Sequence, residues 1–190
     1  MFPSKEQALD LLNEAYLSNP GPWKDHSIIV AKCAYTISKH CDDLDEDKAF
    51  ICGLLHDIGR RYGVTHLAHV IDGYHYLMKL GYEEAARICI THSFAIKDID
   101  TSIGEKDVSD NDLKIINDLI QGYEYDDYDR LIQLCDSISL PDGPVEIEVR
   151  MNDVKQRYGH YPQIKWDKHI ELKHYFENKS GLDIDHLQIQ

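Results

Sequence analysis

The stretch Leu54-Leu55-His56-Asp57-Ile58-Gly59-Arg60 sets both the fold and the chemistry expected of this chain. It closes an apolar helical run that begins at Ala49, so a histidine and an aspartate stand where the side chains should be buried. A buried carboxylate without a partner is strongly unfavourable, and such a group is normally paired or bound to a metal ion. The pair therefore predicts a metal centre whose other ligands lie elsewhere in the chain.

Length and charge limit the class of protein and its partners. The chain has 190 residues, which suits one domain with a sizeable core. Its formal net charge of −14 argues against a nucleic-acid polymer or an anionic membrane as partner, because both would be repelled. Five cysteines form no CxxC pair, and no run approaches the roughly 20 apolar residues of a membrane span. We expect a cytoplasmic protein; the sequence does not indicate its oligomeric state.

The apolar periodicity predicts an all-α fold. Apolar residues recur at three- and four-residue spacing nearly throughout, and no alternating strand pattern is found. Ser4 and Gln7 predict a capping box at the first helix, and Gly59 is expected as the C-terminal glycine of the third. Helices are predicted over about 4–18, 22–40, 46–58, 66–80, 83–93, 111–121 and 127–139, with two more in the tail from Pro144 and a loop or flap over 96–110.

The same pattern predicts a single domain over residues 1–190. Its core should span about 22–140, followed by a C-terminal helical extension over 144–180, because no linker-like composition precedes the tail. In the third helix, small residues such as Gly53 lie one turn before His56. They leave space for either an ion or a neighbouring helix.

Two further polar residues interrupt apolar helical stretches. His26 stands in the middle of the apolar stripe of the second helix, and Asp136 interrupts the apolar run over 131–138. With His56 and Asp57 they make a set of two imidazoles and two carboxylates. Such a set suits divalent ions of the Mn, Fe, Zn, Co, Ni or Mg kind, not a structural thiolate site. For any single histidine a hydrogen-bonded core role is the commoner alternative; the four together favour a metal.

His69 and His92 could add a second ion, with Asp57 bridging the two. His69 shares a partly apolar face with Gly73, and His92 lies on the apolar face of the fifth helix. Two adjacent ions can clamp the attacking and leaving oxygens of a phosphoryl displacement. Alternatively, His92 packs or caps its helix and His69 contacts phosphate. The residues alone leave one and two ions open.

Cations beside the His-Asp pair supply a possible phosphate contact. Arg60 and Arg61 stand at the end of the third helix, where a cation is favoured in any case. Arg60 is the better placed to bind a phosphate bidentately. Arg87 and Arg130 are expected to form surface salt bridges. Five further histidines are expected to be exposed, namely His66, His75, His160, His169 and His174.

These residues resemble the HD-domain superfamily of metal-dependent phosphohydrolases. The superfamily's first histidine, its His-Asp pair and its distal aspartate match His26, His56-Asp57 and Asp136, within a similarity that covers about 23–140. The string His-Asp-Ile-Gly-Arg is close to the common His-Asp-Ile-Gly-Lys form, with Arg60 where lysine is usual.

The resemblance extends to the second group of histidines. The segment from His69 to Tyr74 is similar to the H-x-x-x-G-Y element of members with a second metal, and His92 is similar to their next histidine. The resemblance thus implies an all-α phosphodiesterase-like helical bundle that binds one or two divalent ions. It also implies hydrolysis of a phosphate ester or anhydride of a small molecule, with a nucleotide as the leading candidate.

Two residues carry the expected chemistry. Asp57 should orient the attacking water or accept its proton, and Arg60 should take up charge that develops on the phosphoryl oxygens. Two alternatives remain open at this point. One is a non-catalytic metal or nucleotide sensor that keeps the same ligands, and the other is a helical domain with buried structural histidines.

Overall fold

The all-α prediction is confirmed by a computed structural model that describes residues 1–189 and contains nine α-helices. A two-strand hairpin, which the sequence pattern did not predict, follows α7. The elements in order are α1 Lys5–Ser18, α2 Trp23–Ser38, α3 Glu46–Leu55, η1 Ile58–Tyr62, α4 Ala68–Lys79, α5 Glu83–Thr91, η2 Ile99–Thr101, α6 Asp110–Gly122, α7 Asp127–Asp136, β1 Ser139–Leu140, β2 Gly143–Pro144, α8 Ile147–Tyr158 and α9 Gln163–Ser180, where η denotes a 3₁₀ helix.

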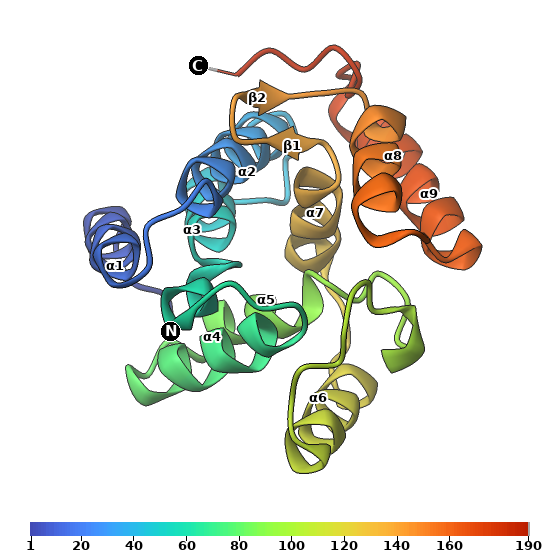
Figure 1. The fold of residues 1–190 in the computed structure, drawn as a ribbon. Coiled ribbons are helices and arrows are strands. Elements are labelled where there is room, and N and C mark those ends of the chain that lie inside the picture. The colour runs from blue at the N-terminus through green and yellow to red at the C-terminus, as the bar shows by residue number, and fades with distance from the viewer. Residues whose placement is uncertain (190) are drawn as a thin grey trace.

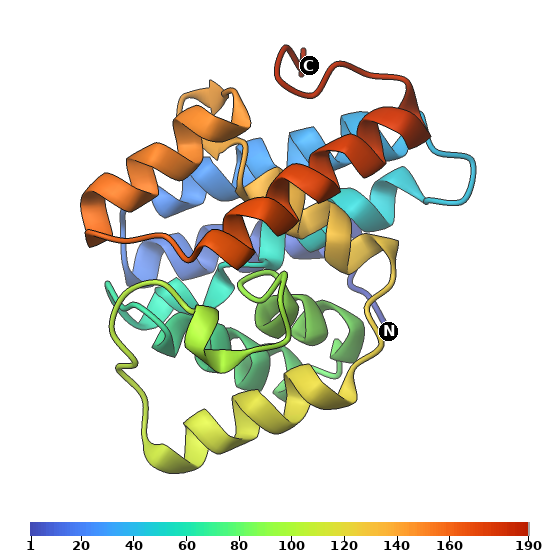
Figure 2. The ribbon, with the colours of Figure 1, turned by 90° about the vertical axis from the view of Figure 1, so that its right-hand side faces the viewer.

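The helices pack around a central pair, α2 and α3 (Figure 1). Helix α1 covers one side of this pair, and α7 with α9 covers the other. Helices α4 and α5 form a second pair, which lies below α2 and α3 in Figure 1, and α6 packs against α5. Figure 2 shows α9 in red running across the molecule beside α7 and α2, with α8 next to it. Within residues 1–189, no helix combines the length and the apolar character that a membrane crossing requires.

Polar residues start the helices where the sequence predicts. At α1 the Ser4 hydroxyl accepts the Gln7 N–H at 3.1 Å, and the Gln7 side chain accepts the Ser4 N–H at 2.8 Å, so the predicted capping box is confirmed. Asp45 accepts the Lys48 N–H at 2.7 Å at the start of α3. These caps fix the entry points of helices whose opposite ends reach the candidate site.

The small residues of α3 accommodate a neighbouring helix. A methyl group at Gly53 would lie 2.5 Å from the Cα of Ala31, which belongs to α2. The backbones of α2 and α3 therefore approach each other more closely than a side chain at position 53 would allow. This close approach brings the end of α3 alongside α2, the helix that carries His26.

The predicted end of the third helix is wrong. Helix α3 ends at Leu55, and the chain turns through His56 and Asp57 into η1. Gly59 lies inside η1 and is not a C-terminal glycine. A methyl group there would lie 2.0 Å from the carbonyl oxygen of His69 and 2.5 Å from the nitrogen of Gly73. The glycine is therefore needed so that η1 can lie directly on the backbone of α4.

Replacement of Gly59 by alanine should destabilise the protein. The added methyl group overlaps backbone atoms of α4, which cannot move away as a side-chain end can. Overpacking of this kind lowers the free energy of unfolding by about 1–3 kcal/mol, and each kcal/mol corresponds to roughly 2–4 °C in a domain of this size. The measurement is thermal unfolding of Gly59→Ala beside Gly122→Ala, whose methyl group meets nothing within 4 Å. Equal melting temperatures would contradict the packing role.

Candidate metal centre

The six predicted ligands meet at one place, and each comes from the end of a helix. His26 and His69 lie in the first turns of α2 and α4, and Asp136 is the last residue of α7. His56 and His92 are the C-cap residues of α3 and α5. Asp57 follows directly in the turn before η1. The structure thus gathers side chains from five helices that are far apart in the sequence.

Asp57 is the centre of the group. One of its oxygens, Oδ1, lies 3.1 Å from Nε2 of His69 and 3.7 Å from Nε2 of His92. The other, Oδ2, lies 2.5 Å from Nε of Arg60 and 3.9 Å from Nε2 of His56. The side chain is 5% exposed, so these neighbours replace water almost completely. Its two oxygens face different partners, which is the arrangement that a bridging carboxylate needs.

Two possible metal groups share this aspartate. The first contains His26, His56 and Asp57, and the second contains Asp57, His69 and His92. In each group the ligand atoms lie within 4.8 Å of one another. Asp136 adjoins the first group, because its Oδ1 lies 3.0 Å from Nε2 of His26. Both groups use imidazole nitrogens and carboxylate oxygens, the donor types that Mn, Fe, Zn and related ions bind.

Backbone carbonyl groups orient three of the histidines. Nδ1 of His56 lies 2.7 Å from the Gly53 carbonyl, Nδ1 of His92 lies 3.1 Å from the Ile88 carbonyl, and Nδ1 of His69 contacts the His66 carbonyl. Since a carbonyl oxygen can only accept, each Nδ1 donates its proton, and the neutral rings of His56 and His92 then carry a lone pair on Nε2. Histidine ligands of metal ions are typically held in this way.

One buried atom shows directly that the site fits an ion. Within the part of the chain that the structure describes, Nε2 of His56 is buried and has no hydrogen-bond partner. Buried polar atoms in native proteins nearly always have a partner. The nitrogen carries a lone pair and stands beside Asp57, so a divalent cation would satisfy both groups.

The electrostatics of the site favour the metal-binding forms of its side chains. Burial on its own would raise the pKa of Asp57, but Arg60, His69 and His56 together hold that pKa well below its usual range. Burial and the neighbouring His56 lower the pKa of His92 to about 3, and burial lowers the pKa of His56. At neutral pH the carboxylate is therefore ionised and these two imidazoles are neutral, as ligation requires.

Arg60, not Arg61, reaches the open side of the site. Its guanidinium donates to Asp57 and, at 3.3 Å, to the Thr65 carbonyl, and its side chain is 27% exposed. The guanidinium of Arg61 instead lies over the ring of Tyr76, 4.0 Å from its centroid. Arg60 lines a cavity of about 610 Å³ together with five of the six predicted ligands, namely His26, Asp57, His69, His92 and Asp136.

Buried polar contacts between α7 and the end of α5 fix the position of His92. Asp129 of α7 is fully buried, accepts from the Thr91 hydroxyl at 2.6 Å and pairs with Arg87 at 3.2 Å. Gln133, one turn further along α7, donates to the Thr91 carbonyl at 2.9 Å. These contacts tie the end of α5 to α7. The surface role predicted for Arg87 is thus incomplete, because the arginine also compensates a buried carboxylate.

The prediction for His169 is wrong. This side chain is 4% exposed and lines the cavity, whereas His75, His160 and His174 are exposed as predicted and His66 is half-buried. The spacing of the buried positions of α9 could have revealed it. Lys165, His169, Leu172 and Phe176 recur at three- and four-residue intervals, so the lysine and the histidine continue an apolar stripe.

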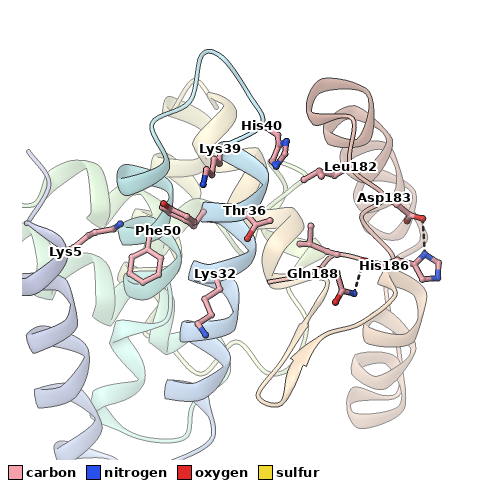
Figure 3. Close-up of a pocket in the computed structure, with 12 residues that line it drawn as sticks. Lys5, Lys32, Thr36, Lys39, His40, Phe50, Leu182, Asp183, His186 and Gln188 are labelled. Carbon is pink, nitrogen blue, oxygen red and sulfur yellow. Dashed lines mark hydrogen bonds and ion pairs between the residues drawn. The ribbon is translucent and has the colours of Figure 1, made fainter. Parts of the chain in front are cut away.

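A second cavity, of about 520 Å³, is lined by none of the six predicted ligands (Figure 3). It is formed by Lys32 and Thr36 in the C-terminal half of α2, by Lys39 just beyond the end of that helix, and by the segment around His186. Neither of the two possible metal groups among the described residues is located there. We therefore place the candidate chemistry at the cavity that Asp57 and Arg60 line.

The helical bundle and its buried histidine–aspartate cluster define an all-α metal-binding domain. Comparison with protein-family models identifies the family, because the HD domain model matches residues 23–140, more than half of the chain. The chain belongs to the HD domain family. The matched region contains all six predicted ligands and ends before α8 and α9. No curated protein and no solved structure matches the chain significantly.

Loss of one ligand should remove bound metal. His56→Gln takes away a buried nitrogen that has no other partner, so we expect the metal content after dialysis to fall at least about tenfold. The measurement is elemental analysis of protein loaded with Mn, Fe, Co, Ni or Zn. His75→Gln is the matched control, because this histidine is exposed on α4 and belongs to neither group.

A chelator provides an independent check. Because an ion bound only by the folded protein stabilises it, chelation should lower the melting temperature of the wild type and of His75→Gln, and should leave His56→Gln nearly unchanged. Equal metal content in the wild type and in His56→Gln would contradict the assignment of the ligands.

Proposed function

We propose that the protein is a metal-dependent phosphohydrolase that cleaves a phosphate ester or anhydride of a small molecule, with nucleotides as the leading substrate class. The observation that carries this proposal is the position of Asp57. Its two oxygens face two groups of histidines, and the same carboxylate holds Arg60 at the edge of the cavity. Membership of the HD domain family and the metal-type cluster support the proposal.

The ligand sets follow from the two groups. His26, His56, Asp57 and Asp136 would hold one ion, and Asp57, His69 and His92 would hold a second. When bound, such ions polarise a phosphoryl oxygen and lower the pKa of a coordinated water.

Asp57 is suited to orienting a water molecule. The pKa of this carboxyl group is held well below its usual range, so it stays ionised at neutral pH and accepts hydrogen bonds. A carboxylate with so low a pKa is a weak base and therefore a poor proton acceptor. Of the two roles expected from the sequence, this favours orientation over proton acceptance.

Arg60 is suited to binding the phosphoryl group. It remains charged, and its contacts with Asp57 and the Thr65 carbonyl fix its guanidinium at the cavity. A guanidinium offers several N–H donors in one plane, which matches the oxygens of a phosphate. Charge that develops on these oxygens during cleavage would be met by a donor that is already in place.

The cavity supports a small anionic substrate. Its volume of about 610 Å³ lies in the range of small-molecule sites. Four arginine and lysine side chains line it against three carboxylates, although the chain as a whole carries a net charge of −14. We propose a phosphate compound as the partner, not a nucleic-acid polymer or a membrane. The five cysteines are free and buried, which supports a cytoplasmic location for the protein.

Replacement of Asp57 by asparagine should abolish hydrolysis. The change keeps the shape of the side chain but removes the charge that holds Arg60 and faces the histidines. We expect turnover to fall at least about 100-fold. The measurement is phosphate release from a panel of nucleotides and a generic phosphodiester, with Mn, Fe, Co or Ni supplied in turn. Asp118→Asn is the matched control, because Asp118 is exposed on α6.

The same panel distinguishes an enzyme from a sensor that keeps the same ligands. Catalysis predicts metal-dependent turnover of at least one compound by the wild type. Micromolar binding of a nucleotide without turnover, under every metal tested, would contradict the proposed function and favour the sensor.

A further inference from the structure

Part of the cavity wall is formed by residues that follow the HD domain match, and this part is cationic. Helices α8 and α9, which follow residue 140, lie together beside α7 (Figure 2). Arg150 and Arg157 of α8 line the cavity, as do Lys165 and His169 of α9. The C-terminal extension thus supplies three of the four arginine and lysine side chains that line this cavity. The predicted metal ligands of the site all belong to the HD domain.

Lys165 is a buried cation without a carboxylate partner among the described residues. Its residue is 6% exposed, and Nζ donates to the Ser93 carbonyl at 2.8 Å and, more weakly, to the Thr101 carbonyl at 3.5 Å. Both acceptors are neutral, and although the charge of Asp136 acts on Lys165, none of the ion pairs among the described residues includes this lysine. Buried ammonium groups are normally paired with an anion, because their desolvation is otherwise unfavourable.

Two further polar atoms on this wall have no partner within residues 1–189. Nε of Arg150 and Nε2 of His169 are buried and make no hydrogen bond. The opposite nitrogen of His169, Nδ1, lies 2.6 Å from the Tyr161 hydroxyl, which fixes the ring. Arg150 uses only its Nη1 on Asp153, at 3.0 Å. Buried polar atoms without a partner are rare in protein interiors, and here two of them belong to residues that line the same cavity as Lys165.

We propose that Lys165, Arg150 and His169 form a second anion site, which binds a phosphate group of the substrate other than the one that is hydrolysed. The inference rests on the proposed function and narrows its substrate class to compounds with at least two phosphate groups. A phosphate fits because it is a multivalent anion whose several oxygens accept hydrogen bonds from different directions. Arg60, on the HD-domain side of the same cavity, is left for the group that reacts.

Binding to the metal-free protein tests the site without any catalysis. The probe is inorganic tripolyphosphate, titrated calorimetrically in the presence of a chelator. We expect Lys165→Met and Arg150→Gln each to weaken binding at least about tenfold, since each removes a charged hydrogen-bond donor. Lys168→Met is the matched control, because Lys168 lies on the same helix but pairs with Glu171 and does not line the cavity.

Two variants keep the test valid if one affects folding. Lys165 also ties α9 to the chain around Ser93, so Lys165→Met can lower the melting temperature. Arg150→Gln removes only a contact within α8, with Asp153. Unchanged tripolyphosphate affinity in folded Arg150→Gln, or equal losses in Lys168→Met, would overturn the proposal.

Kinetics separate failure of this inference from failure of the proposed function. For the active metal-loaded enzyme, the ratio of KM for a nucleoside triphosphate to KM for a generic phosphodiester should rise at least tenfold in Arg150→Gln and stay constant in Lys168→Met. An unchanged ratio in Arg150→Gln would overturn the second anion site while leaving the hydrolase intact. A wild type that turns over neither compound would contradict the proposed function, and the metal-free titration would still decide the anion site.

Discussion

The structure depends on keeping one carboxylate, that of Asp57, ionised inside the protein. A buried charge of this kind is tolerated only where cationic or hydrogen-bonding groups surround it. Here Arg60 lies on one oxygen and His69 on the other, and these contacts lower a pKa that burial would raise. They require η1 and α4 to touch at the backbone, which is why Gly59 cannot carry a side chain. The packing of two elements thus follows from the charge of one residue.

The predicted ligands lie at helix ends, and this location explains how their side chains are oriented. The last carbonyl groups of a helix lack a full set of hydrogen-bond partners within the helix. They can therefore accept a hydrogen bond from a side chain that follows in the sequence. His56 and His92, at the ends of α3 and α5, both use such carbonyls to fix Nδ1. The other ring nitrogen, Nε2, is then directed towards the candidate metal centre, and no further side chain is needed to orient the ring. A site made from helix ends therefore needs few dedicated supporting residues, and Asp129 with Arg87 is the main exception.

The sequence predicts which polar side chains meet in the interior, because helical periodicity indicates which side of a helix is buried. His26 stands within the apolar stripe of its helix, His69 lies on a partly apolar face, and Asp136 interrupts an apolar run. The structure brings all three into the cluster around Asp57. What could not be predicted depends on contacts between distant segments. The role of Gly59 follows from the position of α4, and the burial of His169 follows from the docking of α9 on the HD domain. Neither relation leaves a local pattern as strong as an apolar stripe.

The net charge and the charge of the cavity act over different distances, and together they support the proposed class of substrate. At physiological ionic strength, charges separated by more than about 8 Å are largely screened, so a small anion inside the cavity interacts chiefly with its lining. That lining contains Arg60, Arg150 and Lys165, and bound ions would add further positive charge. A nucleic-acid polymer would extend beyond the cavity onto a surface with a strong excess of carboxylates. An acidic protein can therefore bind a compact polyphosphate while it repels the polymer made of similar units.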